Sequence, residues 1–102
     1  ELPIEEAIAF LRSNFLKAGI LKLANIGLTS IPPAIFQLGL EVEELNLNLN
    51  GIKTFSKDIS KLKNLRVLDL RSNPAINGNS QILNVKLGKL LPNCKLKLGS
   101  AY

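Results

Sequence analysis

The sequence has no histidine and a single cysteine, Cys94, among its 102 residues. Histidine is the commonest general base and metal ligand at neutral pH, so its absence removes most hydrolytic and zinc-dependent chemistry from consideration. One cysteine cannot form an intrachain disulfide or a multi-cysteine metal site. The pairs Asn50-Gly51 and Asn77-Gly78 are turn signals and do not make a phosphate-binding loop. We therefore predict no catalytic residue, no metal site and no cofactor.

Aromatic residues are also scarce, with four Phe, one Tyr and no Trp. Platforms that stack nucleic-acid bases interleave aromatic with basic residues, and the sequence shows no such interleaving. No apolar run reaches the roughly 18 residues that a membrane-spanning helix needs. Neither nucleic-acid binding nor membrane insertion is expected.

Acidic residues become rare after residue 44. Residues 1–44 contain six acidic and three basic side chains, net −3, whereas residues 45–102 contain two acidic and ten basic side chains, net +8. A basic half favours an anionic partner. The alternative is that the lysines form an ordinary solvated surface.

Apolar residues recur with a fixed period. Two segments 23 residues apart share one pattern, Val42-x-x-Leu45-x-Leu47-x-x-Asn50-x-Ile52 and Leu65-x-x-Leu68-x-Leu70-x-x-Asn73-x-Ala75. The same pattern fits residues 18–28, and it resumes 26 residues after Leu65 at Leu91-x-x-Cys94-x-Leu96. The following halves, residues 28–38 and 52–62, also align, and Leu40 is the extra residue between repeats.

This pattern resembles the leucine-rich-repeat family, whose signature is L-x-x-L-x-L-x-x-N-x-L at a period of 20–29 residues. The resemblance covers residues 18–98. It implies an α/β leucine-rich-repeat solenoid with a short curved parallel sheet, and convex segments that are short and non-helical. It also implies repeats at residues 18–41, 42–64 and 65–90, and the length of the chain fits one domain, residues 1–102.

The Leu-x-Leu alternation predicts one strand in each repeat, with alternate side chains facing the core. We expect four leucines to face inward: Leu45, Leu47, Leu68 and Leu70. Asp58 falls on the convex side and Asp69 in the sheet, so these two carboxylates cannot act as a catalytic pair. The sequence therefore predicts that the protein is not an enzyme.

The resemblance implies that Asn50 and Asn73 point inward and bond the backbone of adjacent turns. A buried backbone group without a partner costs about 1–3 kcal/mol, which explains the preference for a short amide. The first repeat departs from the pattern, because Ile26 stands at the Asn position.

Helices are predicted at both ends, because the open ends of a solenoid need caps. Residues 1–17 form the first, with Pro3 at its start, Gly19 at its stop and an apolar stripe of Ile4, Ile8, Leu11 and Phe15. Ser80 caps the second, which runs to about Leu91 and packs through Leu83, Val85, Leu87 and Leu90. Residues 91–102 form a closing strand and tail.

In this family ligands usually bind the concave sheet face. The outward strand positions that we predict to contact a partner are Lys22, Glu44, Asn46, Asn48, Val67, Asp69, Arg71, Lys95 and Lys97. The alignment places Asp69 beside Lys95, and Arg71 beside Lys97. The second pair would be uncompensated and would suit an acidic group.

Two further residues are expected on the surface. Phe36 aligns with Ser60, so we expect it to be exposed near Leu40 as a possible convex contact. Leu49 follows a strand at the position of Ser72, so it should be exposed as well.

The sequence thus predicts a monomeric protein-interaction module that binds a protein partner on the concave face without catalysis. Two alternatives stay open. The chain is a purely structural repeat unit or a fragment of a larger receptor or adaptor, or it binds anionic surfaces through its basic half.

Overall fold

The computed structural model describes residues 3–76, 78 and 80–99, which form a body of 35 × 27 × 22 Å. The elements in chain order are α1 (Ile4–Asn14), β1 (Leu16–Lys17), β2 (Ile20–Lys22), α2 (Ala34–Gln37), η1 (Gly39–Glu41), β3 (Glu44–Asn46), η2 (Lys57–Lys61), β4 (Val67–Asp69), α3 (Ser80–Leu90) and β5 (Lys95–Lys97). Within these described residues, no helix is both long and apolar enough to cross a membrane.

The strands form one five-stranded sheet in the order β1-β2-β3-β4-β5. Strands β2 to β5 are parallel, but β1 runs antiparallel to β2, so the sheet is mixed and the prediction of an all-parallel sheet is wrong for β1. Ala18 and Gly19 reverse the chain between β1 and β2 with φ of 53° and 81°. Two consecutive left-handed residues make the turn typical of a tight hairpin.

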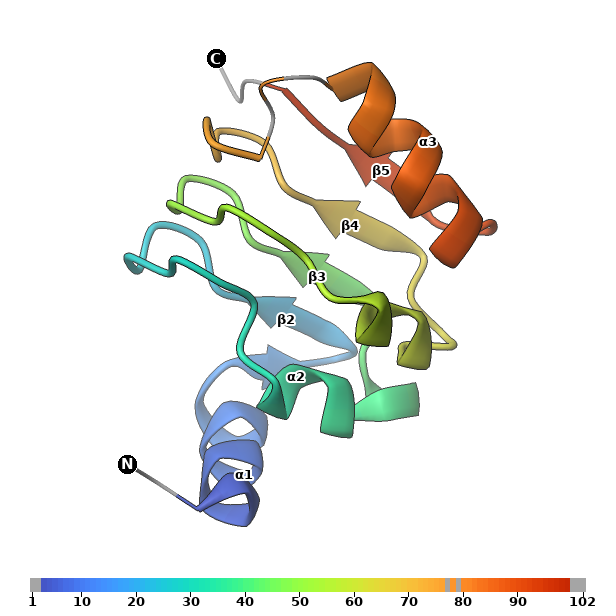
Figure 1. Ribbon diagram of the computed structural model, residues 1–102. Coiled ribbons are helices and arrows are strands. Elements are labelled where there is room, and N and C mark those ends of the chain that lie inside the picture. Colours follow the sequence, from blue (N-terminus) through green and yellow to red (C-terminus); the bar gives the residue numbers. More distant parts are fainter. Residues whose placement is uncertain (1–2, 77, 79, 100–102) are drawn as a thin grey trace.

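The core lies between the sheet and the return segments, with α2, η2 and α3 on one face of the sheet (Figure 1). Leu45, Leu47, Leu68 and Leu70 are fully buried in it, as predicted from the Leu-x-Leu alternation. Each such side chain stabilises the fold by about 1.5–3 kcal/mol relative to an exposed position. The opposite face of the sheet, which carries the alternate residues, we call the outward face.

Asn50 and Asn73 are buried and tie successive turns together, which confirms the predicted role. The Asn50 side chain accepts from the N–H of Ile26 and Leu28 at 3.1 and 3.0 Å and donates to the carbonyls of Leu23 and Leu47 at 2.9 and 3.0 Å. Asn73 repeats the arrangement one turn later, donating to the carbonyls of Leu47 and Leu70. Each amide thus satisfies backbone groups of its own turn and of the preceding turn.

Three aligned residues have a left-handed backbone, each directly before Ile26, Asn50 or Asn73. Asn25, Leu49 and Ser72 have φ of 54°, 57° and 59°. Asn adopts this conformation readily, whereas an ordinary L residue is strained there. Leu49 is half-buried rather than fully exposed. Ser72 and Leu49 are thus both strained, and the bulkier Leu49 is strained more.

Helix α1 is shorter than predicted and ends at Asn14, because Leu16 and Lys17 belong to β1. Pro3 precedes its first turn, where the missing N–H of proline costs nothing. Leu11 is buried and Ile8 partly so, but Ile4 is exposed, so the predicted apolar stripe covers only part of the helix.

The prediction that Phe36 is exposed is wrong, because only 6% of its surface is accessible. Helix α1 packs against α2, and Phe36 belongs to the same apolar cluster as Leu11. Ser60, the aligned residue one repeat later, lies in η2 between α2 and α3 and is half-buried. Leu40 stays 64% exposed, so the proposed convex contact loses Phe36 and retains Leu40 alone.

The return segments contain short helices, which corrects the prediction that they are non-helical. Helix α2 makes a single turn after Pro32-Pro33, and η2 is a 3₁₀ helix of five residues. The Ser56 side chain accepts from the backbone N–H of Asp58 at 3.0 Å and so caps η2.

Helix α3 begins at Ser80, whose side chain lies outside the described part, so its predicted capping role stays a prediction. Leu83 and Leu87, four residues apart, are buried and Leu90 is half-buried. Val85 is 59% exposed, which contradicts its predicted packing role. It lies on the opposite side of the helix from the Leu83–Leu87 stripe.

Candidate functional site: the outward face of the sheet

The outward face places most of the predicted contact residues side by side. Backbone pairing aligns Ile20, Glu44, Val67 and Lys95 in one row, and Lys22, Asn46, Asp69 and Lys97 in the next. Backbone hydrogen bonds extend the face to Asn48, Arg71 and Gly99. All nine residues predicted from the sequence therefore lie on one face.

The predicted pairing of the last strand is wrong by two residues. Lys97, not Lys95, is the partner of Asp69, and Gly99 stands where Lys97 was expected beside Arg71. A slip of two residues keeps every side chain on its predicted face, so the alternation alone could not detect it. The uncompensated pair of Arg71 and Lys97 does not exist.

Arg71 is instead bound by Asp69 of its own chain segment. The backbone N–H and Nε of Arg71 donate to Oδ1 of Asp69 at 3.1 and 3.0 Å, and Nη2 donates to Oδ2 at 2.8 Å. The Nδ2 amide of Asn48 donates to Oδ2 as well, at 3.3 Å. We call Asn48, Asp69 and Arg71 the polar triad. Its carboxylate has only 7% of its side chain exposed, while 35% of the guanidinium side chain stays exposed.

The electrostatics of the triad favour the ionised forms. Burial would raise the pKa of Asp69, but the hydrogen bonds and charge of Arg71 and the bond from Asn48 outweigh it and lower that pKa. The same carboxylate raises the pKa of the Arg71 guanidinium. A fixed, charged guanidinium with unused N–H donors can recognise carboxylate or carbonyl groups of a partner.

The ends of the face are basic. Lys22 and Lys95 are exposed and Lys97 is half-exposed. Among the described residues, the four ion pairs are Arg12–Glu41, Lys61–Asp58, Arg66–Glu43 and Arg71–Asp69, so these three lysines have no acidic partner. Glu44 and Val67 lie half-exposed between them. Two lysines on β5 therefore leave uncompensated positive charge beside the polar triad.

Sequence reasoning missed a hollow at the N-terminal edge of this face. It measures about 670 Å³. Its lining comes from residues 13–18 and from two residues of β2, Ile20 and Lys22. Ile20 is exposed there, and Phe15 packs its ring against Phe10 with 5.8 Å between centroids. The hollow could not be predicted because it depends on β1, and a two-residue strand is too short to show a periodic pattern in the sequence.

The single cysteine, Cys94, is a weak nucleophile. Cys94 is half-buried, and burial raises the pKa of its thiol to about 11, although a backbone hydrogen bond at Leu68 acts in the opposite direction. A thiol with so high a pKa is a poor nucleophile and metal ligand at neutral pH. The part of the chain that the structure describes contains no cluster of three potential metal ligands.

Comparison with known proteins identifies the same repeat. The family model described as "Leucine rich repeat" matches residues 19–74, from the β1–β2 turn to the turn after β4. No curated protein matches the sequence. Domains built from this repeat generally mediate protein–protein interactions and are typically non-catalytic. The match spans more than half of the chain, which therefore belongs to the leucine-rich repeat family.

Proposed function

We propose that this protein is an interaction module that binds an acidic segment of a protein partner on the outward face of its sheet. In this proposal the stacked repeats form a short solenoid, α1 and α3 cover its two ends, and the outward face is concave. The observation that carries the proposal is the polar triad beside β5, where a fixed guanidinium adjoins two uncompensated lysines.

The size of the face limits the partner. The four parallel strands β2 to β5 span three strand spacings of about 4.8 Å each. Such a face buries several hundred Å² per partner, roughly the scale of a small interface. It suits one extended segment or one loop, held by the triad and by ionic contacts to Lys95 and Lys97. Attraction by these exposed lysines should chiefly increase the association rate.

Charge reversal on β5 tests the proposal. Lys95→Glu with Lys97→Glu should weaken partner capture at least tenfold, whereas Lys57→Glu with Lys63→Glu makes the same change in net charge away from the face. Arg71→Glu is less suitable, because it would also remove the two guanidinium hydrogen bonds that hold the buried Asp69. Equal loss of binding in both double variants would refute the site, and unchanged binding in the β5 variant would refute it as well.

The absence of acidic residues after Asp69 favours a second candidate, adsorption to an anionic surface. Binding of this kind depends on many weak ionic contacts and weakens steeply with salt. Titration with vesicles of phosphatidylserine at two salt concentrations decides between the candidates. Binding to vesicles with equal loss in the two double lysine variants would support the surface candidate.

A further inference from the structure

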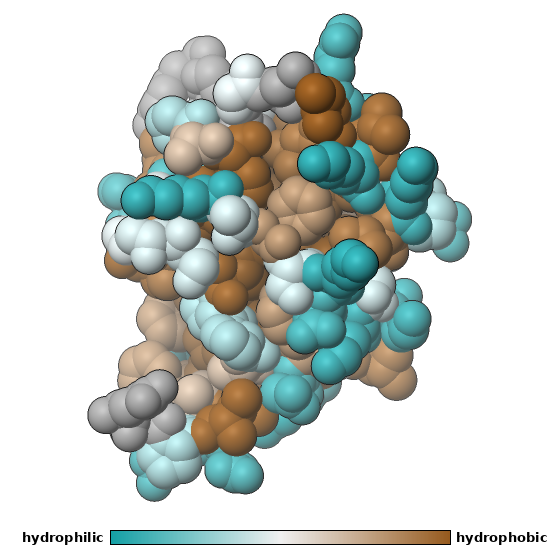
Figure 2. Space-filling model, viewed as in Figure 1, coloured by the Kyte–Doolittle hydropathy of each residue, from teal (hydrophilic) through white to brown (hydrophobic). Residues whose placement is uncertain are grey.

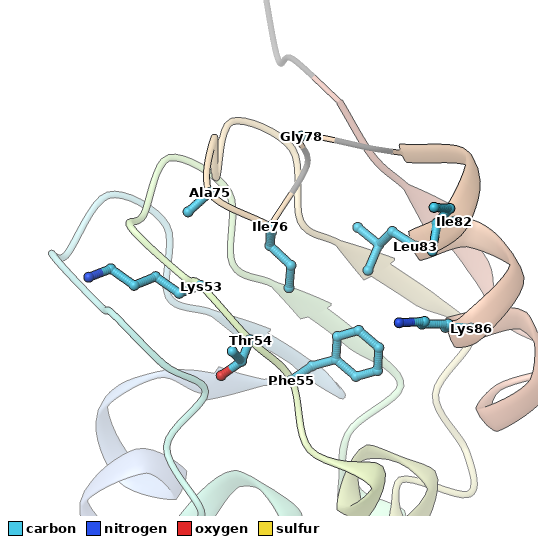
Figure 3. Close-up of a pocket in the computed structure, with 9 residues that line it drawn as sticks. All are labelled: Lys53, Thr54, Phe55, Ala75, Ile76, Gly78, Ile82, Leu83 and Lys86. Carbon is cyan, nitrogen blue, oxygen red and sulfur yellow. The ribbon is translucent and has the colours of Figure 1, made fainter.

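A second hollow lies on the opposite side of the molecule, between the return segments and α3. It encloses about 400 Å³, and its lining includes Phe55, Ile76, Ile82, Leu83 and two lysines, Lys53 and Lys86. Figure 3 shows Phe55, Ile76 and Leu83 pointing toward one another from three separate segments of the chain. We call this hollow the α3 groove.

The α3 groove has an apolar floor that continues onto the helix. Leu83 is buried and Phe55 and Ile76 are half-buried at the bottom, while Ile82 at the rim is 52% exposed. Ile82 also lines a shallow neighbouring depression on α3 with Val85, Lys86 and Lys89. Figure 2 shows this face, with apolar surface in the hollow beside α3 and hydrophilic side chains standing around it. A joined apolar surface of this kind marks a contact site more often than isolated exposed residues do.

The rim of the groove is positively charged. Lys86 reaches from α3 toward the middle of the groove, whereas the Lys53 side chain points away from it on the side of the return segments (Figure 3). Lys89 follows one turn later on α3. None of the ion pairs within the described residues involves these three lysines. The sequence has no acidic residue after Asp69, so α3 has no acidic side chain of its own.

We propose that the α3 groove binds a short protein segment that carries acidic and large apolar side chains together. The apolar side chains enter the groove over Phe55, Ile76 and Leu83, and a carboxylate pairs with Lys86. This site is separate from the proposed outward-face site, because its residues come from the return segments and α3 and not from the strands. A lipid bilayer fits less well, because Leu83 lies at the bottom of a hollow that a flat surface does not reach.

Selection from a library of random twelve-residue peptides tests the proposal with the whole chain as bait. We expect the recovered peptides to be enriched in Asp or Glu together with Leu, Ile, Phe or Trp. Their affinity should fall at least tenfold for Ile82→Asp and for Lys86→Glu. Two matched variants should keep the affinity, Ile4→Asp for an exposed isoleucine and Lys63→Glu for an exposed lysine.

Three outcomes would overturn the proposal. The first is a selection that recovers no binder, or only peptides without acidic residues. The second is recovered peptides that lose affinity for Lys95→Glu with Lys97→Glu but not for Ile82→Asp, because these bind the outward face. The third is loss of binding to phosphatidylserine vesicles in Ile82→Asp without any effect on peptides. Circular dichroism of each variant separates loss of the site from loss of the fold.

Discussion

Arg71 donates three hydrogen bonds to Asp69, one from its backbone and two from its guanidinium. The two residues lie on the same side of the chain at the end of β4, two positions apart, so the contact forms within one segment. It orders a guanidinium before any partner arrives, and this lowers the entropy cost of binding. Lysine at this position could not make the forked contact.

The acid stability of the protein should depend on Asp69. Its pKa in the folded chain lies below the ordinary value of 3.8, so the ionised form favours the folded state. This contribution is complete above the unfolded-state pKa and is lost as the pH falls through the folded-state pKa. We expect the free energy of unfolding to decrease below about pH 4, and to decrease less steeply in Asp69→Asn. Urea titrations at several pH values measure both slopes.

A Glu41 variant is the control for this experiment, because Glu41 also contributes to acid stability. A side-chain hydrogen bond from Arg12 lowers its pKa too, so it contributes with the same sign. Glu41→Gln should change the slope less than Asp69→Asn, because the Arg12–Glu41 pair is solvent-exposed and exposed pairs contribute little. A larger effect of Glu41→Gln would contradict the assignment to Asp69.

Asn73→Ala should strongly destabilise the fold. The substitution removes three side-chain hydrogen bonds, those to the carbonyls of Leu47 and Leu70 and the one from the N–H of Ile52. At about 1 kcal/mol for each lost hydrogen bond, we expect a loss of roughly 3 kcal/mol. Asn64→Ala removes one exposed hydrogen bond, to the carbonyl of Leu40, and should cost well under 1 kcal/mol. Similar losses in the two variants, measured by urea unfolding, would show that Asn73 does not join the turns.

Leu49→Asn should stabilise the protein, because asparagine tolerates the left-handed backbone that leucine adopts at φ of 57°. We expect a gain of about 0.5–1 kcal/mol, less than the full strain because leucine also loses some burial. Leu49→Val should be destabilising, since a β-branched residue suits this backbone least. Thermal unfolding of the three proteins ranks them, and a Leu49→Asn protein that melts below the parent would contradict the strain.

Cys94 should react slowly with thiol reagents. A pKa of about 11 instead of 9.0 reduces the thiolate fraction at pH 8 by about a hundredfold. Labelling with a disulfide reagent should therefore be slow in the folded protein and should become fast in urea. Equal rates in the two states would show that Cys94 is more accessible than the structure indicates.

Much of the fold could be predicted because the repeat encodes it directly. The positions of Leu45, Leu68, Asn50 and Asn73 follow from a pattern in which each residue type has one physical role. The periodic pattern of a single sequence is most informative in such repeats, because two aligned copies predict the same structure independently. The same alternation placed all nine outward-face residues correctly.

The errors arose where a contact between distant elements decides the outcome. Phe36 is buried because α1 packs against α2, which no alignment of repeats contains. The register of β5 depends on the length of the α3 segment, and a two-residue slip leaves the side-chain pattern unchanged. The short strand β1 depends on the Ala18-Gly19 turn, and a glycine after an apolar stripe equally fits the end of a helix. The α3 groove forms between three segments and has no sequence signature.

Photocrosslinking, which locates the surface that a partner contacts, is the most direct test of binding on the outward face. A photoreactive benzoyl-phenylalanine placed at Asn46, between Lys22 and Asp69 on the outward face, should crosslink to a captured partner. The same group placed at Lys63, exposed after η2, should not. Adducts from residue 46 alone are the predicted result. Adducts from residue 63 with none from residue 46 would contradict binding on the outward face.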